Sequence, residues 1–463
     1  MKANSLIYTA LTATVMAMFA CAFACATAKA IAPTPDTVRS ADSANIPLEE
    51  RVFMASKMYA DMGVYCAHLQ TIPDFDLDAA YRSYLKEALA AKGRYEFDLA
   101  SQAFVAELHN GHSEFFDRWL VTNYGGSMGF RAMYIEGKWI VTHSDLAALK
   151  PGDVIANIGS EPAEALFQKQ KRYLNASNER WARSIFFNRR YLFPQTFELT
   201  LEGGRKVAID RKPKPKQAEL KTEGKWIKAD TIAYIKIPSF DAPEFEQTAI
   251  QLVKKYHTAK SLIIDLRGNG GGSTPGELID GLMDRPYRGS TQATPLSMAV
   301  IKTRGGFFDK MKQDPSAKKD ETYGYMEAMK EMSDNVQLLF TSRPQKPENT
   351  LYKGSLYVLI DRDVFSAGED FCIPFKDNHR ALFLGETTGG STGQPYFYLF
   401  TNGSGFRVSA KRDSFPDGSP FEGIGVVPDI AIPTLQKSLA ANVDDVMERA
   451  IALATAASAS PAR

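Results

Sequence analysis

Ser366 is the residue of this chain whose surroundings best suit a nucleophile. It follows an apolar strand and precedes a helix-compatible run that begins at Ala367. A strand-to-helix turn exposes a side chain above the sheet edge and points helix N–H groups at whatever binds there. The same residues also fit a plain helix cap, because Glu369 three positions later completes a capping-box pattern.

A glycine-rich loop supplies a second piece of chemistry. The sequence DLRGNGGG at residues 265–272 leads from an apolar strand to a helix that is expected to begin at Thr274. Consecutive glycines let the backbone approach a ligand closely and turn N–H groups toward it. The loop lacks the spacing of a nucleotide-binding motif, so an oxyanion hole for acyl transfer fits better. Asp265 and Arg267 are expected to brace it.

Four ordered motifs give the chain a family resemblance. They are DLRGNGGG, FSAGE at 365–369, GETTGG at 385–390 and GVVPD at 425–429. Together they resemble the tail-specific (C-terminal processing) protease family, which also includes the tricorn protease core and interphotoreceptor retinoid-binding protein. The resemblance covers roughly residues 100–432. It implies an α/β catalytic core of crotonase/Clp-protease-like type, with Ser366 as the nucleophile.

The family divides by its general base. The processing proteases use a Ser–Lys dyad, but Ser391 stands at the position of that lysine, and the chain has no lysine between Lys376 and Lys411. The tricorn-like branch uses a histidine from an N-terminal block, and NGHS at residues 110–113 matches that block with His112. His109 is a near neighbour with which it could be confused.

The resemblance also implies a carboxylate and a further serine that orient the histidine. Glu422 matches the carboxylate, although it could be a turn residue, and Gly111 stands where the tricorn branch has its serine. An imidazole suits the removal of a serine proton, and a carboxylate would fix its tautomer. The N–H groups of Gly271 and Ala367 are the expected oxyanion donors.

Several elements must position these residues. Helical periodicity predicts an N-terminal helical domain over residues 45–124, with helices between residues 48 and 108. Alternating strands and helices predict a parallel α/β core over residues 225–435. An insertion with helices is expected at residues 286–350, and an Ala/Ser-rich tail that can fray at residues 436–463.

Between these domains, residues 125–212 are expected to form a β-rich module. LKPGDVIANIG at residues 149–159 resembles a PDZ signature, and SMGF at residues 127–130 resembles the PDZ carboxylate loop. Such a loop binds a peptide's terminal carboxylate, which makes Met128, Gly129 and Phe130 the expected peptide-binding residues. An unrelated β-domain with a Pro-Gly-Asp turn is the alternative.

Bulk properties exclude several function classes. The chain has 463 residues and a formal net charge of +1, so it lacks the excess of positive charge that is typical of nucleic-acid-binding proteins. Residues 1–30 read as a signal peptide, and a lipoprotein site or a membrane anchor are the alternatives. After its removal Cys66 and Cys372 remain, either as one disulfide or as buried free thiols. No metal or organic cofactor is indicated.

The sequence therefore predicts an exported serine endopeptidase, periplasmic or secreted, that cleaves peptides or partly unfolded proteins. No integral membrane span is expected in the mature chain. The alternative is a non-catalytic binder of hydrophobic ligands or protein C-termini on the same fold. The substrate, the cleavage specificity and the oligomeric state are left open.

Overall fold

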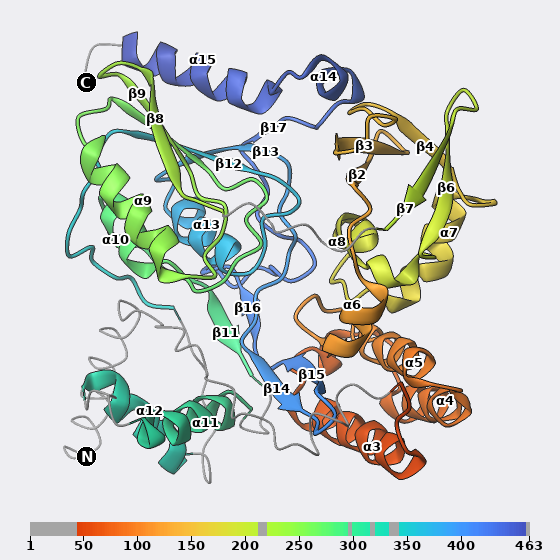
Figure 1. Cartoon of the computed structure of the whole chain (residues 1–463). Helices are drawn as coiled ribbons and strands as arrows, with labels where there is room; N and C mark the ends of the chain where they lie inside the picture. Colours follow the sequence, from red (N-terminus) through yellow and green to blue (C-terminus); the bar gives the residue numbers. More distant parts are fainter. Residues whose placement is uncertain (1–43, 212–219, 295–298, 315–319, 333–341, 460–463) are drawn as a thin grey trace.

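A computed structural model describes residues 44–211, 220–294, 299–314, 320–332 and 342–459 (Figure 1). The predicted signal peptide at residues 1–30 lies outside the described residues. Within them, no helix is long and apolar enough to cross a membrane.

The largest unit is built around a six-stranded sheet in the order β17-β13-β12-β10-β9-β8. Neighbouring strands from β9 to β17 run parallel, and β8 pairs antiparallel with β9 at one edge. The alternation of strands and helices predicted for this region is confirmed. The strands are β8 (Glu223–Lys228), β9 (Ile232–Lys236), β10 (Ser261–Asp265), β12 (Ser355–Ile360), β13 (Leu382–Gly385) and β17 (Ile430–Ala431).

Helices cover both faces of this sheet (Figure 1). One face packs against α9 (Pro243–Lys255), α10 (Gly276–Leu282) and α13 (Ala367–Asp377). The other face packs against α15 (Asp445–Ala459) through the fully buried Ala450 and Ala454. Residues on a buried parallel strand alternate between two covered faces, so both faces need such a layer.

The C-terminal residues differ from the expectation. Residues 436–459, which we expected to form a tail, contain α14 (Gln436–Ala441) and α15. The small side chains that suggested fraying instead let α15 lie close against the sheet. The Ala/Ser-rich composition alone did not reveal that a face of the central sheet would cover this helix.

The N-terminal helices α3 (Leu48–Tyr65), α4 (Leu77–Ala90) and α5 (Arg94–Ala106) confirm the helical periodicity. Their core also includes Phe400, Phe406 and Val408, which come from far along the chain. These residues belong to or adjoin a three-stranded sheet that the sequence did not predict, in the order β1-β15-β14. Its strands are β1 (Glu114–Asp117), β14 (Pro395–Leu399) and β15 (Ser404–Ser409), and α6 (Arg118–Tyr124) follows β1.

The β-rich module is an antiparallel sheet, which confirms its expected strand content. It also carries a helical insert between β5 and β6 that the sequence did not predict. Its strands are β2 (Phe130–Ile135), β3 (Lys138–Ser144), β4 (Val154–Ile158), β5 (Glu161–Pro162), β6 (Thr196–Leu201) and β7 (Lys206–Asp210). The insert contains α7 (Ala163–Gln170), α8 (Glu179–Ile185) and the short 3-10 turns η2 (Lys171–Tyr173), η3 (Phe186–Asn188) and η4 (Arg190–Leu192).

The expected insertion contains two helices, α11 (Ala299–Gln313) and α12 (Glu321–Met332). They pack on each other away from the central sheet (Figure 1). The preceding strand β11 (Thr291–Ala293) pairs with β16 (Arg412–Ser414). This pairing ties the insertion to the segment that leads away from β15.

The two cysteines of the described chain are free and buried. Cys66 lies in the core of the N-terminal helices, whereas Cys372 lies on α13 in the core of the α/β unit. Of the two alternatives left by the sequence, the structure therefore shows free thiols.

Candidate active site

Ser366 sits on a sharp turn between β12 and α13. Its backbone has φ of 55° and ψ of −123°, in the positive-φ range that non-glycine residues rarely adopt. Its side chain makes no cap hydrogen bond, so the helix-cap alternative does not describe it. The turn instead leaves the hydroxyl available to a neighbouring side chain.

That neighbour is His112, in the loop between α5 and β1. Its Nε2 lies 3.0 Å from Ser366 Oγ, and its Nδ1 lies 2.9 Å from Ser391 Oγ. The imidazole is buried, and burial lowers its pKa well below the usual value, with further contributions from Arg407 and Lys411. A low pKa keeps the ring neutral and able to accept a proton at neutral pH. His109, by contrast, is exposed.

Glu422, the carboxylate expected to orient the histidine, lies near His112 but does not contact the ring. Nδ1 of His112 meets Ser391, and Ser391 hydrogen-bonds to Glu422. Glu422 also accepts the backbone N–H of Thr392 at 3.2 Å and the side-chain amide of Asn110 at 3.4 Å. Desolvation raises the pKa of Glu422 well above its usual value, and the repulsion of Asp413 adds to this. The carboxylate therefore reaches the imidazole through a hydroxyl.

Sequence reasoning missed Ser391 as the partner of His112. It noted only that Ser391 replaces a lysine and that Gly111 replaces the serine of the tricorn block. The signal was present in these two replacements together, because a hydroxyl lost at one position is supplied at the other. Only the fold shows that Ser391 lies against a ring nitrogen of His112.

Aromatic rings hold His112 in place from one side. The imidazole stacks on Phe365 at 4.7 Å between centroids, and Phe365 stacks on Trp181 at 4.2 Å. Gly111 and Gly389 make room for these rings, since a Cβ at either position would lie within 2.9 Å of Phe365. A serine at position 111 would meet the same obstruction, which gives a steric reason for the glycine.

The glycine loop approaches Ser366 as predicted. A Cβ on Gly271 would lie 2.7 Å from both Ser366 Cβ and the Phe365 carbonyl, and Gly271 has φ of 94°. Its N–H, however, donates to Asn269 Oδ1 at 2.9 Å. In this structure the Gly271 N–H is therefore already bonded to Asn269. This side-chain oxygen competes with the oxyanion to which we expected the N–H to donate. Among the described residues, no acceptor pairs with the Ala367 N–H at the start of α13.

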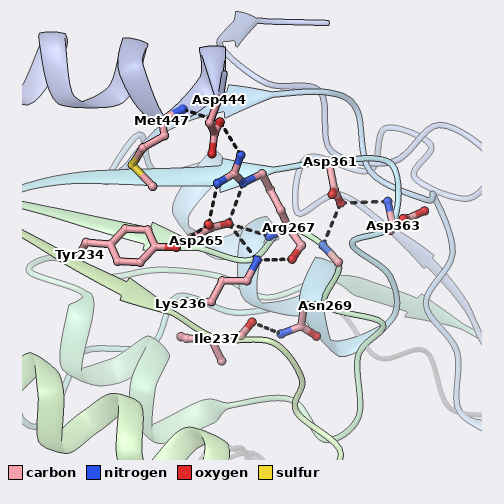
Figure 2. Close-up of polar contacts among 11 residues, drawn as sticks. Tyr234, Lys236, Ile237, Asp265, Arg267, Asn269, Asp361, Asp363, Asp444 and Met447 are labelled. Carbon is pink, nitrogen blue, oxygen red and sulfur yellow. Dashed lines mark hydrogen bonds and ion pairs between the residues drawn. The ribbon is translucent and has the colours of Figure 1, made fainter. Parts of the chain in front are cut away.

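A polar network braces the same loop (Figure 2). Asp265 accepts the Arg267 backbone N–H at 3.0 Å and bonds to its guanidinium, as expected from the sequence. Tyr234 also donates to Asp265, at 2.7 Å, and Asn269 donates to the Ile237 carbonyl at 3.0 Å. These bonds fix the loop to β9 and β10. Among the residues that the structure describes, no group of His, Cys, Asp or Glu side chains is arranged to hold a metal ion.

Residues 175–181 of the β-rich module reach several parts of this site. Asn175 donates to the Gly111 carbonyl at 3.0 Å, beside His112. Asn178 donates to the carbonyls of Gly389 at 2.8 Å and Gly423 at 3.1 Å. Arg180 donates to the carbonyls of Thr388 and Ile424 (3.2 Å for Nε–Thr388, 3.0 Å for Nη2–Ile424). The module thus binds the segments that carry His112, Ser391 and Glu422.

The expected peptide loop lies elsewhere in the module. The side chains of Met128 and Phe130 are buried in its core. Gly129 has φ of 73°, and its N–H donates to Ser127 Oγ at 3.2 Å. The structure thus brings together Ser366, His112, Glu422, Gly271 and Ala367, and leaves the loop at residues 128–130 apart from them.

Comparison with known proteins defines the class. Residues 231–432 match the model of peptidase family S41, so the chain contains a domain of that family, as its motifs predicted. Carboxyl-terminal-processing peptidase 2 of Arabidopsis thaliana chloroplasts is 25% identical over 293 residues, which are 62% of this chain and 47% of that protein. A protein of Chlamydia pneumoniae is 34% identical over 91 residues, which are 19% of this chain and 15% of that protein. The chain thus spans less than half the length of these curated relatives.

Among solved structures, mature CPAF is similar to this chain with a TM-score of 0.68 and 15% identity, over 88% of this chain and 96% of CPAF. This likeness shows a shared fold. His112 lies outside the matched family region, so the residue that contacts Ser366 comes from the N-terminal part of the chain.

Proposed function

We propose that this chain is a serine endopeptidase that hydrolyses peptide bonds through an acyl-enzyme on Ser366. The observation that carries the proposal is the position of His112, whose two ring nitrogens lie 3.0 Å from Ser366 Oγ and 2.9 Å from Ser391 Oγ. A base that touches the nucleophile with one nitrogen and an orienting group with the other is the arrangement nucleophilic catalysis requires.

The first chemical step moves one proton. Nε2 of neutral His112 takes the proton of Ser366 as Oγ attacks the carbonyl carbon of the peptide. The Nδ1–H of the resulting imidazolium is directed at Ser391, whose own proton is directed at Glu422. Negative charge develops on the carbonyl oxygen at the N-terminus of α13, where the Ala367 N–H and the helix dipole favour it.

The second step releases the products. Nε2–H passes its proton to the leaving amine, and the acyl group stays on Ser366. Water then attacks the ester carbonyl while Nε2 of His112 takes its proton. The bond between the acyl carbon and Oγ breaks, the proton on Nε2 passes to Ser366 Oγ, and the acid product leaves. The second oxyanion donor belongs to the glycine loop. It is the Gly271 N–H, once this group no longer donates to Asn269.

The finer features of the function follow from the sequence. We propose that residues 1–30 direct export and that the substrates are peptides or partly unfolded proteins. The loop at residues 128–130 would bind a terminal carboxylate of the substrate. A peptide with a free C-terminus should then bind more tightly than its C-terminal amide.

Cleavage of an unfolded protein tests the proposal. The wild-type protein should convert reduced, unfolded casein into peptides, and Ser366→Ala should yield none. Casein that stays intact with wild type, while Ser366→Ala and wild type bind it equally, would instead favour the non-catalytic binder. Equal cleavage by both proteins would place the activity outside Ser366.

A further inference from the structure

Glu369 is a fully buried carboxylate that does not cap its own helix. It lies on α13 three residues after Ser366, and the capping-box pattern would direct it back to the Ser366 N–H. Instead it accepts three hydrogen bonds from the chain after β13. The donors are the Thr388 hydroxyl at 2.5 Å, the Gly390 N–H at 2.8 Å and the Ser391 N–H at 3.0 Å.

These bonds close a ring of contacts around the nucleophile. The Ser366 N–H donates to the Ser391 carbonyl at 3.1 Å, so the two serines are joined through their backbones. Their hydroxyls are joined through His112. Glu369 adds the contact from the Ser391 N–H back to the nucleophile's helix. Ser391 is thereby fixed on both sides of its Cα, and its Oγ has a defined direction.

We propose that Glu369 is a positioning residue, which holds residues 388–391 so that Ser391 Oγ meets Nδ1 of His112. The proposal rests on the proposed function. Glu369 would touch neither substrate nor the reacting atoms, and its effect on the reaction would pass through Ser391. A buried carboxylate with three donors is a rigid anchor, because each donor would lose a buried hydrogen bond if the segment moved.

The charge state of Glu369 matters to this anchor. Burial raises its pKa to about 8, while the Thr388, Ser391 and Gly390 donors oppose the shift. The titratable groups that face it are Asp370 and Cys372 on α13, Arg180 on α8 and Glu422. The ionised form, which predominates only above this pKa, can accept all three bonds, whereas a protonated carboxyl turns one oxygen into a donor. The labelling rates of the test below are therefore compared above this pKa.

Glu369→Gln is the informative variant, because it keeps the size of the side chain. If its amide oxygen accepts from Thr388 and Gly390, its amide nitrogen faces the Ser391 N–H, and two donors cannot bond. Ser391 then loses its tether. Asp377→Asn is the matched control, since Asp377 lies on the same helix but pairs with Arg288.

The test is a double-mutant cycle on the rate of fluorophosphonate labelling. Glu369→Gln should label about tenfold more slowly than wild type, whereas in a Ser391→Ala background the same change should have almost no effect. Asp377→Asn should label at the wild-type rate. Equal slowing in both backgrounds would make Glu369 a general stability residue and overturn the proposal, and so would wild-type labelling by Glu369→Gln.

A spectroscopic readout separates this inference from the proposed function. In protein labelled with nitrogen-15 histidine, Glu369→Gln should shift the Nδ1–H signal of His112 and leave the signal of exposed His143 unchanged. That result would support the positioning role even if wild type were not labelled at all, which would contradict the peptidase alone. An unchanged His112 signal would overturn the positioning role.

Discussion

At the scale of single residues, the site depends on one imidazole between two hydroxyls. Ser366 is the nucleophile candidate, but its reactivity in this account comes from the orientation of His112. Because Nδ1 meets Ser391 and not Glu422, the hydroxyl is the first group that fixes the ring. Phe365 stacks on the imidazole and restricts its tilt, but its ring offers no hydrogen-bond partner to Nδ1. It therefore cannot replace Ser391.

Ser391→Ala should therefore slow peptide cleavage by about 10²-fold, the lower end of what a positioned general base contributes. The fold should persist, because alanine fits the same buried space. Steady-state kinetics would show the loss in kcat with KM nearly unchanged. Ser404→Ala removes another buried hydroxyl, bonded to Asn402, and should have no such effect. A normal kcat for Ser391→Ala would show that Glu422 or water orients the ring.

Gly271 offers a second test at this scale. Alanine there would place a Cβ 2.7 Å from Ser366 Cβ at a backbone φ of 94°, so loop and nucleophile cannot both keep their positions. Gly271→Ala should abolish detectable cleavage, whereas Gly270→Ala, which meets nothing within 4 Å, should retain it. Cleavage assays with thermal melts would check both. An active Gly271→Ala variant would contradict the close approach of the loop.

At the scale of elements, the β-rich module is a structural part of the site. Its residues 175–181 bind backbone carbonyls beside His112, Ser391 and Glu422. Trp181 adds the outer ring of the stack. The module is therefore predicted to influence catalysis whether or not its loop at residues 128–130 binds a peptide.

Asn178→Ala tests this coupling. It removes the donor to the Gly389 and Gly423 carbonyls, and an unpaired buried polar group costs about 1–3 kcal/mol. Cleavage should fall roughly tenfold, as expected when about 1.4 kcal/mol of positioning is lost. Gln168→Ala on α7 of the same module, whose exposed side-chain amide donates to Glu164, is the control. Equal activity of the two variants would mean that the module merely adjoins the site.

Particular residues show which features of the fold and the site can be predicted from the sequence. Apolar runs predicted the strands before the glycine loop and before Ser366, which are β10 and β12, because parallel strands buried on both faces are continuously apolar. Motif matches predicted Ser366 and His112, which the fold brings to 3.0 Å. Ser391 contacts His112, and Asn178 contacts Gly389. Each contact joins two loops that lie more than two hundred residues apart in the sequence. Neither periodicity nor local spacing carries that information.

At the scale of the whole molecule, the site lies where three units meet. The N-terminal helices supply His112, the β-rich module supplies residues 175–181, and the α/β unit supplies Ser366 and Glu422. Behind His112, the second buried imidazole, His68, lies 3.3 Å from Ser409 Oγ and joins the helices to β15. Stability of this junction should therefore depend on pH.

Burial lowers the pKa of His68 to about 4, below the 6.5 of an ordinary histidine, and nearby Arg412 contributes. Between these values the unfolded chain binds more protons, so the free energy of unfolding falls as pH falls from 6.5 through 4. The loss is on the order of 3 kcal/mol. His68→Gln, which cannot titrate, should lose less over this window in urea unfolding. Parallel pH profiles for wild type and His68→Gln would contradict the assignment.

Ser366 is proposed to be a nucleophile that His112 activates. A fluorophosphonate probe followed by peptide mapping tests this proposal. One adduct is expected on Ser366 in the wild-type protein, none in Ser366→Ala, and strongly slowed labelling in His112→Ala. A folded wild-type protein without an adduct, or His112→Ala labelled at the wild-type rate, would contradict it.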